Sequence, residues 1–144
     1  MNFPRDLIKG NVSLGERLGR HTSFRIGGPA AIWVQPRDVK ELKRIVIFAG
    51  ENRIPTFVIG GGTNLLARDE GFDGIVIHLG ASAFKNIRIS GTTIRVGPGY
   101  SVPALVRLCC SEGLSGLESL IGIPGTVGGA VCMNAGGWSS PPGG

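Results

Sequence analysis

Residues 58–67 read VIGGGTNLLA, and this stretch decides the fold prediction because an apolar run ends in three consecutive glycines. Glycine has no Cβ, so successive glycines allow backbone N–H groups to turn toward one point and approach a ligand closely. Thr63 and Asn64 follow with side chains that can add hydrogen bonds. The pattern is neither a Walker A motif nor G-x-G-x-x-G. It predicts a loop around a bulky anionic group, and a tight turn that only needs positive φ is the alternative.

The segments before this loop alternate between strand and helix patterns. Residues 31–35 (AIWVQ) and 55–60 (PTFVIG) are short apolar runs typical of strands. Between them, residues 36–54 predict a helix with Asp38 as N-cap and Glu41 completing a capping box. Apolar residues recur at helical spacing at Val39, Leu42, Ile45, Val46 and Ala49, and Phe48 extends the apolar side. The predicted unit is strand, helix, strand and glycine loop.

Beyond the loop, strands are expected first and a helix second. The stretches GIVIHL (74–79), NIRIS (86–90) and TIRVG (93–97) read as strands, and the last two form a hairpin around a Gly-Thr turn. Ser101 is predicted to cap a helix that stops at Gly113 and buries Val102, Leu105, Val106 and Cys109. A break near residues 70–73 would divide two mixed α/β lobes, residues 1–70 and 71–137, and residues 138–144 would form an irregular tail.

A second glycine-rich tract, GLESLIGIPGTVGGAVCMNAGG, covers residues 116–137. Its Gly125, Gly128 and Gly129 fall where a backbone turn would enter a helix, which makes it a second candidate anion site. Close packing of a helix on a sheet is an equally good explanation of these glycines. Taken together, two such tracts from opposite lobes suit a long ligand with a central pyrophosphate.

The composition argues against several function classes. The net charge is +5, but Lys and Arg are scattered and aromatic residues make up only 6%, which is not typical of a nucleic-acid interface. A mild positive field that attracts an anionic small molecule is the better interpretation. No apolar run reaches the roughly 18 residues of a membrane span and no signal pattern opens the chain, so a cytoplasmic location is expected. Cys109, Cys110 and Cys132 lack metal-ligand spacing, so no metal site is expected, and all three are predicted to be buried thiols.

Four ordered blocks carry a resemblance to a known family. They are HTSFRIGGPA (21–30), VIGGGTNLLARDEGFDGIVIHL (58–79), VGPGY (96–100) and GLESLIGIPGTVGGAVCMNAG (116–136). Together they resemble the FAD-binding half of the UDP-N-acetylenolpyruvoylglucosamine reductase family, which acts in bacterial peptidoglycan-precursor synthesis. The glycine loop alone would indicate only the wider vanillyl-alcohol-oxidase-like flavoprotein fold. The resemblance implies an α/β (α+β), two-lobed FAD-binding fold that is truncated at its C-terminal end.

The resemblance also implies the cofactor contacts. The pyrophosphate of noncovalent FAD would be wrapped by Gly60, Gly61, Gly62, Thr63, Asn64 and Leu65. The other side of the cofactor would be lined by Ile123, Pro124, Gly125, Thr126, Val127, Gly128, Gly129 and Ala130, with Asn134 and Gly136 near the flavin end. In the complete enzyme NADPH would reduce FAD, and the flavin would reduce an enolpyruvyl UDP-sugar to UDP-N-acetylmuramate.

No catalytic residue is assigned within this chain. By the resemblance, the proton donor belongs to a later segment, so these 144 residues alone are expected to be inactive. A non-enzymatic flavin- or nucleotide-binding module is the alternative, and a purely structural glycine-rich fold is a third. His21 and His78 are expected to be ordinary surface or strand-end residues. Arg25 is expected to meet either a phosphate or a carboxylate.

Overall fold

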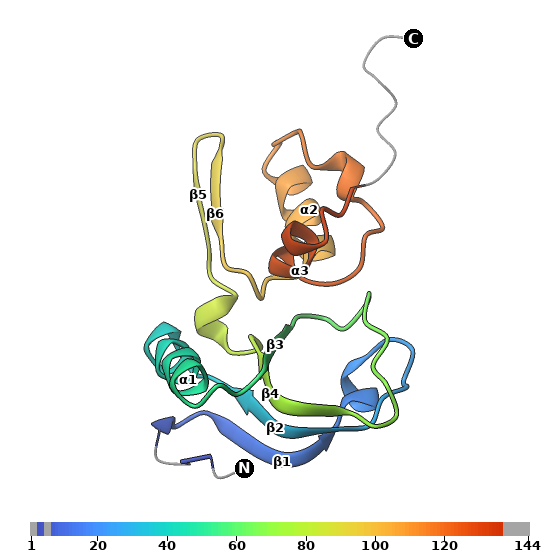
Figure 1. Cartoon of the computed structure of the whole chain (residues 1–144). Coiled ribbons are helices and arrows are strands. Elements are labelled where there is room, and N and C mark those ends of the chain that lie inside the picture. The colour runs from blue at the N-terminus through green and yellow to red at the C-terminus, as the bar shows by residue number, and fades with distance from the viewer. Residues whose placement is uncertain (1–2, 5–6, 137–144) are drawn as a thin grey trace.

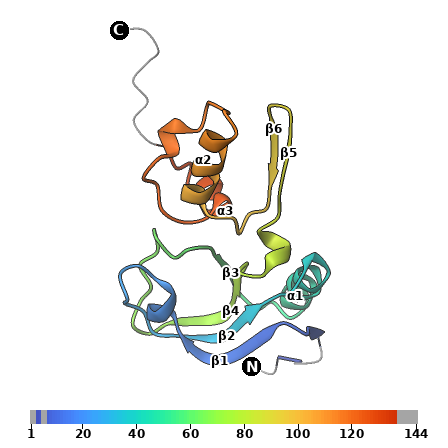
Figure 2. The ribbon, with the colours of Figure 1, turned by 180° about the vertical axis from the view of Figure 1, so that it is seen from behind.

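The computed structural model describes residues 3–4 and 7–136, so the predicted tail at 138–144 lies outside the described residues. Its larger part is a four-stranded sheet with one helix, and its smaller part combines a two-stranded hairpin with short helices (Figure 1). Figure 2 shows from behind that the hairpin and the helices of the smaller part stand on one side of the sheet. Two α/β parts were predicted, and the mixed α/β architecture is confirmed.

The four-stranded sheet has the order β1-β2-β4-β3. β1 (Asn11–Arg17) pairs antiparallel with β2 (Pro29–Gln35), whereas β4 (Phe72–His78) pairs parallel with both β2 and β3 (Thr56–Ile59). The helix α1 (Val39–Glu51) connects β2 to β3, which confirms the predicted strand, helix, strand and loop. The carboxyl ends of three parallel strands therefore lie at one edge of the sheet.

The position of β4 corrects one expectation. The predicted break near residues 70–73 would have put this strand in the second lobe, but it lies between β2 and β3 in the first sheet. Its continuous apolar run explains the placement, because residues 74–77 are buried and a strand covered on both faces reads as unbroken apolar sequence. The part of the chain that forms the first sheet therefore ends at His78, not near residue 70.

The two faces of this sheet pack against different partners. Ile32, Val34, Ile75 and Ile77 face α1 and form a buried cluster with its Ile45. On the opposite face Trp33 and Val76 pack with Leu18, Ile59 and Ala67, below the glycine loop. Since side chains alternate along a strand, Gln35 and His78 share the face of Trp33 and Val76. The glycine loop and these polar strand ends thus occupy the same side of the sheet.

The start of α1 confirms the predicted cap and corrects its details. The Asp38 side chain accepts a hydrogen bond from the Glu41 amide at 2.9 Å, as an N-cap should. Glu41 does not complete a capping box, because its carboxylate accepts from backbone amides outside the helix. Val39 and Val46, which the apolar spacing included, are exposed, so the buried stripe is narrower than the sequence pattern.

The smaller part follows the predicted order. After the short helix η3 (Ser82–Phe84), β5 (Ile87–Ser90) and β6 (Thr93–Val96) form an antiparallel hairpin. The helix α2 (Val102–Ser111) is capped by Ser101, and its predicted apolar side is buried. The short helices η4 (Glu118–Leu120) and α3 (Val127–Cys132) complete this part.

The cysteine prediction is correct for Cys109 only. Cys109 lies on the buried side of α2, whereas Cys110 and Cys132 are exposed, so they are not core residues. Helical periodicity explains the difference between the two neighbours in α2, because adjacent positions point about 100° apart. Within the described residues, no helix is both long and apolar enough to cross a membrane.

Candidate functional site

The two glycine tracts meet in the structure. A Cβ on Gly61 would come within 3.0 Å of the Gly125 Cα, and one on Gly60 would collide with the Thr126 hydroxyl. The Thr63 hydroxyl donates a long hydrogen bond of 3.4 Å to the Pro124 carbonyl. These contacts join the loop after β3 to the turn before α3. The absence of side chains at Gly60 and Gly61 is what permits so close an approach.

The first tract presents backbone amides that have no partner within the protein. In the described part of the chain, the backbone amides of residues 61–65 donate no hydrogen bond to a backbone carbonyl of another loop or to a side chain. The loop is instead held through an acceptor, because the Ser23 amide donates to the Gly62 carbonyl at 3.0 Å. Gly62 has φ +63°, a left-handed conformation that turns the chain at this point. The loop is therefore fixed in shape while its donors remain available.

In the second tract, most backbone amides donate hydrogen bonds to other groups of the protein. Thr126 is the N-cap of α3, which confirms the predicted turn into a helix. The Val127 and Gly128 amides donate to the Tyr100 and Pro98 carbonyls, and the Ala130 amide donates to the Thr126 carbonyl within the helix. Few amides of this tract therefore remain to bind an anion. This favours the alternative explanation of its glycines, close packing of the backbone.

A cavity of about 470 Å³ lies beside the first tract. It is lined by residues of three segments: Arg20, His21, Thr22, Ser23 and Arg25; Gly60 and Gly61; and His78. Among the described residues its lining includes no Asp or Glu and no member of the second tract. Cationic side chains, hydroxyls and bare glycine backbone on one cavity form an environment suited to an anion.

Two histidines that line the cavity lie against the buried Trp33. The His21 ring stacks on Trp33, with ring centroids 3.9 Å apart and planes at 21°, and His78 lies 5.4 Å from the same tryptophan. His21 Nε2 is 3.0 Å from the Glu16 carboxylate, which fixes the ring against the sheet. His78 Nδ1 is 2.9 Å from Gln35 Nε2. Each ring is thus held by one side-chain partner, Glu16 for His21 and Gln35 for His78.

The charge of His78 is suppressed by its surroundings. Burial lowers the pKa of His78 first, and the positive fields of His21 and Lys85 lower it further. The His78 ring is therefore protonated only at pH values below those at which histidine ordinarily takes up its proton. Near neutral pH the ring is therefore an uncharged donor and acceptor.

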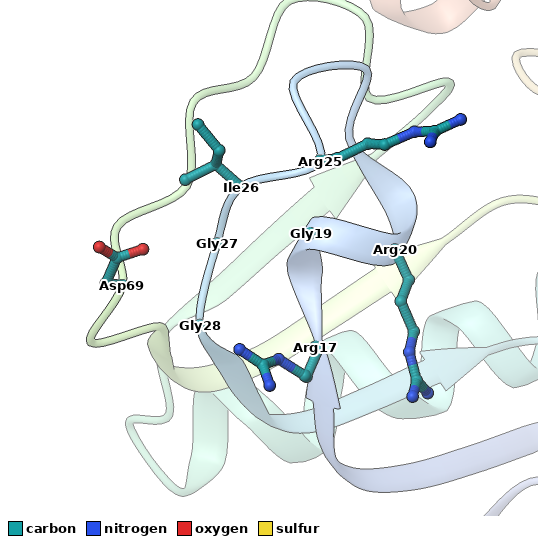
Figure 3. A pocket seen from close by; sticks show the side chains of 8 residues that line it. All are labelled: Arg17, Gly19, Arg20, Arg25, Ile26, Gly27, Gly28 and Asp69. Atoms are coloured by element: carbon teal, nitrogen blue, oxygen red, sulfur yellow. The ribbon is translucent and has the colours of Figure 1, made fainter.

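A larger cavity of about 600 Å³ shares Arg20 and Arg25 with the first one but not the glycine loop. It is lined by Arg17, Arg20 and Arg25 together with backbone and Asp69. Figure 3 shows that the three arginine side chains point in different directions and do not converge. Arg20 also lies 3.7 Å from the Glu16 carboxylate. Size alone therefore does not make this cavity the better site, and the glycine loop favours the smaller one.

The structure brings together part of the predicted site. Gly60 and Gly61 line the cavity, and the residues from Gly60 to Thr63 touch the segment from Pro124 to Thr126. The cofactor contacts predicted for these residues and for the rest of both glycine tracts, Asn64, Leu65, Ile123, Asn134 and Gly136 included, stay predictions. Arg25 lines both cavities, and its carboxylate alternative has no support among the ion pairs of the described residues.

Sequence reasoning missed the two histidines. His78 ends a strand as expected, but its register partner is Ile59, the residue just before the glycine loop. His21 reaches the loop through the contact between its own backbone carbonyl and Gly62. The only available signal was that GIVIHL ends in a polar residue at the carboxyl end of a parallel strand, where α/β sheets place ligands.

The sequence comparisons identify close matches to this chain. A family model described as FAD binding domain matches residues 30–144. A UDP-N-acetylenolpyruvoylglucosamine reductase from Syntrophotalea carbinolica is 47% identical over 131 residues, which is 91% of this chain and 44% of that protein. The chain therefore spans less than half the length of this relative.

The structural comparisons agree with this match. The crystal structure of the same kind of reductase from Thermus caldophilus has a TM-score of 0.71 at 39% identity, covering 90% of this chain and 43% of that one. Cholesterol oxidase from Brevibacterium sterolicum has a TM-score of 0.68 at 16% identity, covering 97% of this chain and 27% of the oxidase. The second likeness concerns the fold alone, and it supports the predicted vanillyl-alcohol-oxidase-like architecture.

Proposed function

This chain belongs to the FAD binding domain family and is a homologue of the N-terminal part of UDP-N-acetylenolpyruvoylglucosamine reductases, and from that premise we propose that its glycine loop binds the pyrophosphate of noncovalent FAD. The observation that carries the proposal is the row of unpartnered amides at residues 61–65. Two phosphates with charged oxygens are suitable acceptors for such donors.

The residues present fit this group. A Cβ on Gly60 or Gly61 would be blocked by the segment around Gly125 and Thr126, so the loop needs bare backbone where the two parts meet. The adjoining cavity supplies Arg20 and Arg25 and no acidic side chain among the described residues. Thr63 and Asn64 add further polar groups on the same loop. Charge and shape thus favour an anionic cofactor of extended form.

In the complete enzyme, FAD supplies hydride transfer between NADPH and the enolpyruvyl group of a UDP-sugar. This chain's residues would bind and orient the cofactor: the loop amides hold the phosphates, and the segment from Ile123 to Ala130 lies across from them. We place the protein in the cytoplasm, in the synthesis of a peptidoglycan precursor. The proton donor of that reaction is not assigned to any residue of this chain.

Titration with FAD tests the proposal directly. FAD fluorescence is expected to change on binding, and FAD at about 100 times its dissociation constant should stabilise the chain by about 2.7 kcal/mol. Riboflavin, which lacks both phosphates, is the matched control and should bind much more weakly. If FAD at about ten micromolar protein changes neither the fluorescence nor the unfolding midpoint, the chain does not bind the cofactor in this way.

A further inference from the structure

His78 occupies the position where the carboxyl ends of two strands meet. Its register partner is Ile59, the last residue of β3, and Gly60 after it begins the glycine loop. The ring lines the same cavity as Gly60 and Gly61. A side chain in this position can reach a group that those glycines hold, because both belong to one sheet edge.

A chain of side-chain hydrogen bonds fixes which nitrogen of the His78 ring carries the hydrogen. Asn11 Nδ2 donates to Gln35 Oε1 at 3.1 Å, which leaves Gln35 Nε2 to face His78. The Gln35 amide therefore donates to His78 Nδ1 at 2.9 Å, and the hydrogen of the neutral ring lies on Nε2. The tautomer follows from this network of three residues.

The Nε2 nitrogen has no partner and is not sealed from solvent. No hydrogen bond to His78 Nε2 is found among the described residues. No buried side-chain nitrogen or oxygen in that part of the chain lacks a partner, so an unpartnered Nε2 must be reached by solvent. A Cβ on Gly80 would crowd the edge of the ring, closest to Cε1 and Nδ1 and 3.4 Å from Nε2, so the bare Gly80 backbone leaves room beside the ring.

From this geometry we propose that His78 binds the cofactor as an uncharged Nε2–H donor, held in that tautomer by Gln35, and hydrogen-bonds a phosphate oxygen held by the glycine loop. The inference rests on the proposed function. The charged and titratable groups that face or adjoin the ring are Lys85, Arg20, Arg25 and His21, and the Glu16 carboxylate already contacts His21. Because Arg20 and Arg25 already supply positive charge on the cavity, the His78 ring contributes a directed hydrogen bond and no further charge.

Three substitutions separate this role from simple packing. The amide of His78→Gln can take the place of Nε2–H, so its FAD affinity should stay within about threefold of the wild-type chain. The amide of His78→Asn reaches only the Nδ1 position and His78→Ala has none, so both should lose about tenfold or more, as expected for a hydrogen bond to a charged group. Because the Asn and Gln variants are both polar and of similar size, their comparison does not depend on the stability of the Ala variant.

The pH dependence of FAD affinity distinguishes a neutral donor from an imidazolium ion. Between about pH 6.5 and 8.5 the affinities of the wild-type chain and His78→Gln should vary in parallel, because every other titratable group on the cavity is common to both. If the wild-type chain alone gained affinity as the pH fell, His78 would bind as a cation and the proposal would be wrong. Equal affinity in all three variants and the wild-type chain would also overturn it, whereas failure of the wild-type chain to bind FAD would contradict the proposed function itself.

Discussion

Gly62→Ala is expected to abolish FAD binding and to lower the free energy of unfolding by about 2–5 kcal/mol. Gly62 has φ +63°, where an L-residue is strained, and its new Cβ would collide with the His21 carbonyl and lie 2.9 Å from the His21 carbonyl carbon. Relief of this collision must move either the glycine loop or the backbone of His21, and both line the site. Urea unfolding and FAD titration measure the two effects.

Gly91→Ala is the matched control for this substitution. Gly91 has nearly the same conformation, φ +57°, but it lies in the turn between β5 and β6 and nothing surrounds its Cβ position within 4 Å. Only the backbone strain of about 1 kcal/mol should appear, and FAD affinity should be unchanged. If the Gly62 variant were no less stable than this control and still bound FAD normally, the loop would not be the rigid cradle described here.

Local patterns were sufficient to predict most elements of the fold. The cap at Asp38, the cap at Ser101 and the apolar runs of β2 and β3 each depend on residues that are close in sequence. The placement of β4 could not be predicted in the same way. A fully buried strand shows no alternation, so its sequence does not reveal which strands lie beside it.

The candidate site shows the same limit at the level of side chains. The glycine loop was predicted because its composition is unusual within a few residues. Glu16 and His21 are close in sequence, but His78 comes from a distant segment, and only the pairing of β1, β2 and β4 brings it to them. No local pattern marks such a cluster, so sequence reasoning assigned both histidines to ordinary positions.

Glu41 is a second residue whose role depends on distant segments. The residue is only 3% exposed, and its carboxylate accepts hydrogen bonds from the Lys9, Gly10 and Arg37 amides at 2.9, 3.2 and 2.8 Å. The Arg37 guanidinium lies 3.9 Å away but is mostly exposed, so the amides are the main partners. Glu41 thus ties the segment before β1 to the first turn of α1.

Glu41→Ala is therefore expected to destabilise the chain by about 3–5 kcal/mol, since three amides would lose their acceptor. Glu41→Gln retains one good acceptor but places N–H groups against amide donors, and about 2 kcal/mol should be lost. Glu51→Gln removes a negative charge from an exposed position of the same helix and should leave the unfolding midpoint unchanged. Urea unfolding at neutral pH gives these values. Equal midpoints for the Glu41 and Glu51 variants would show that Glu41 does not stabilise the fold by joining these two segments.

The contribution of Glu41 should also depend on pH in a defined direction. Burial raises the pKa of Glu41, but the amides of Arg37, Lys9 and Gly10 together outweigh it, so its pKa in the folded chain is below 4.5, the ordinary value. An acid of this kind stabilises the folded state fully above its unfolded pKa, and the stabilisation is lost as the pH falls through the folded value. The stability difference between the wild-type chain and Glu41→Gln should therefore be constant near neutrality and shrink below about pH 4.5. A difference that grew on acidification would mean that the protonated form of Glu41, and not the carboxylate, holds the amides.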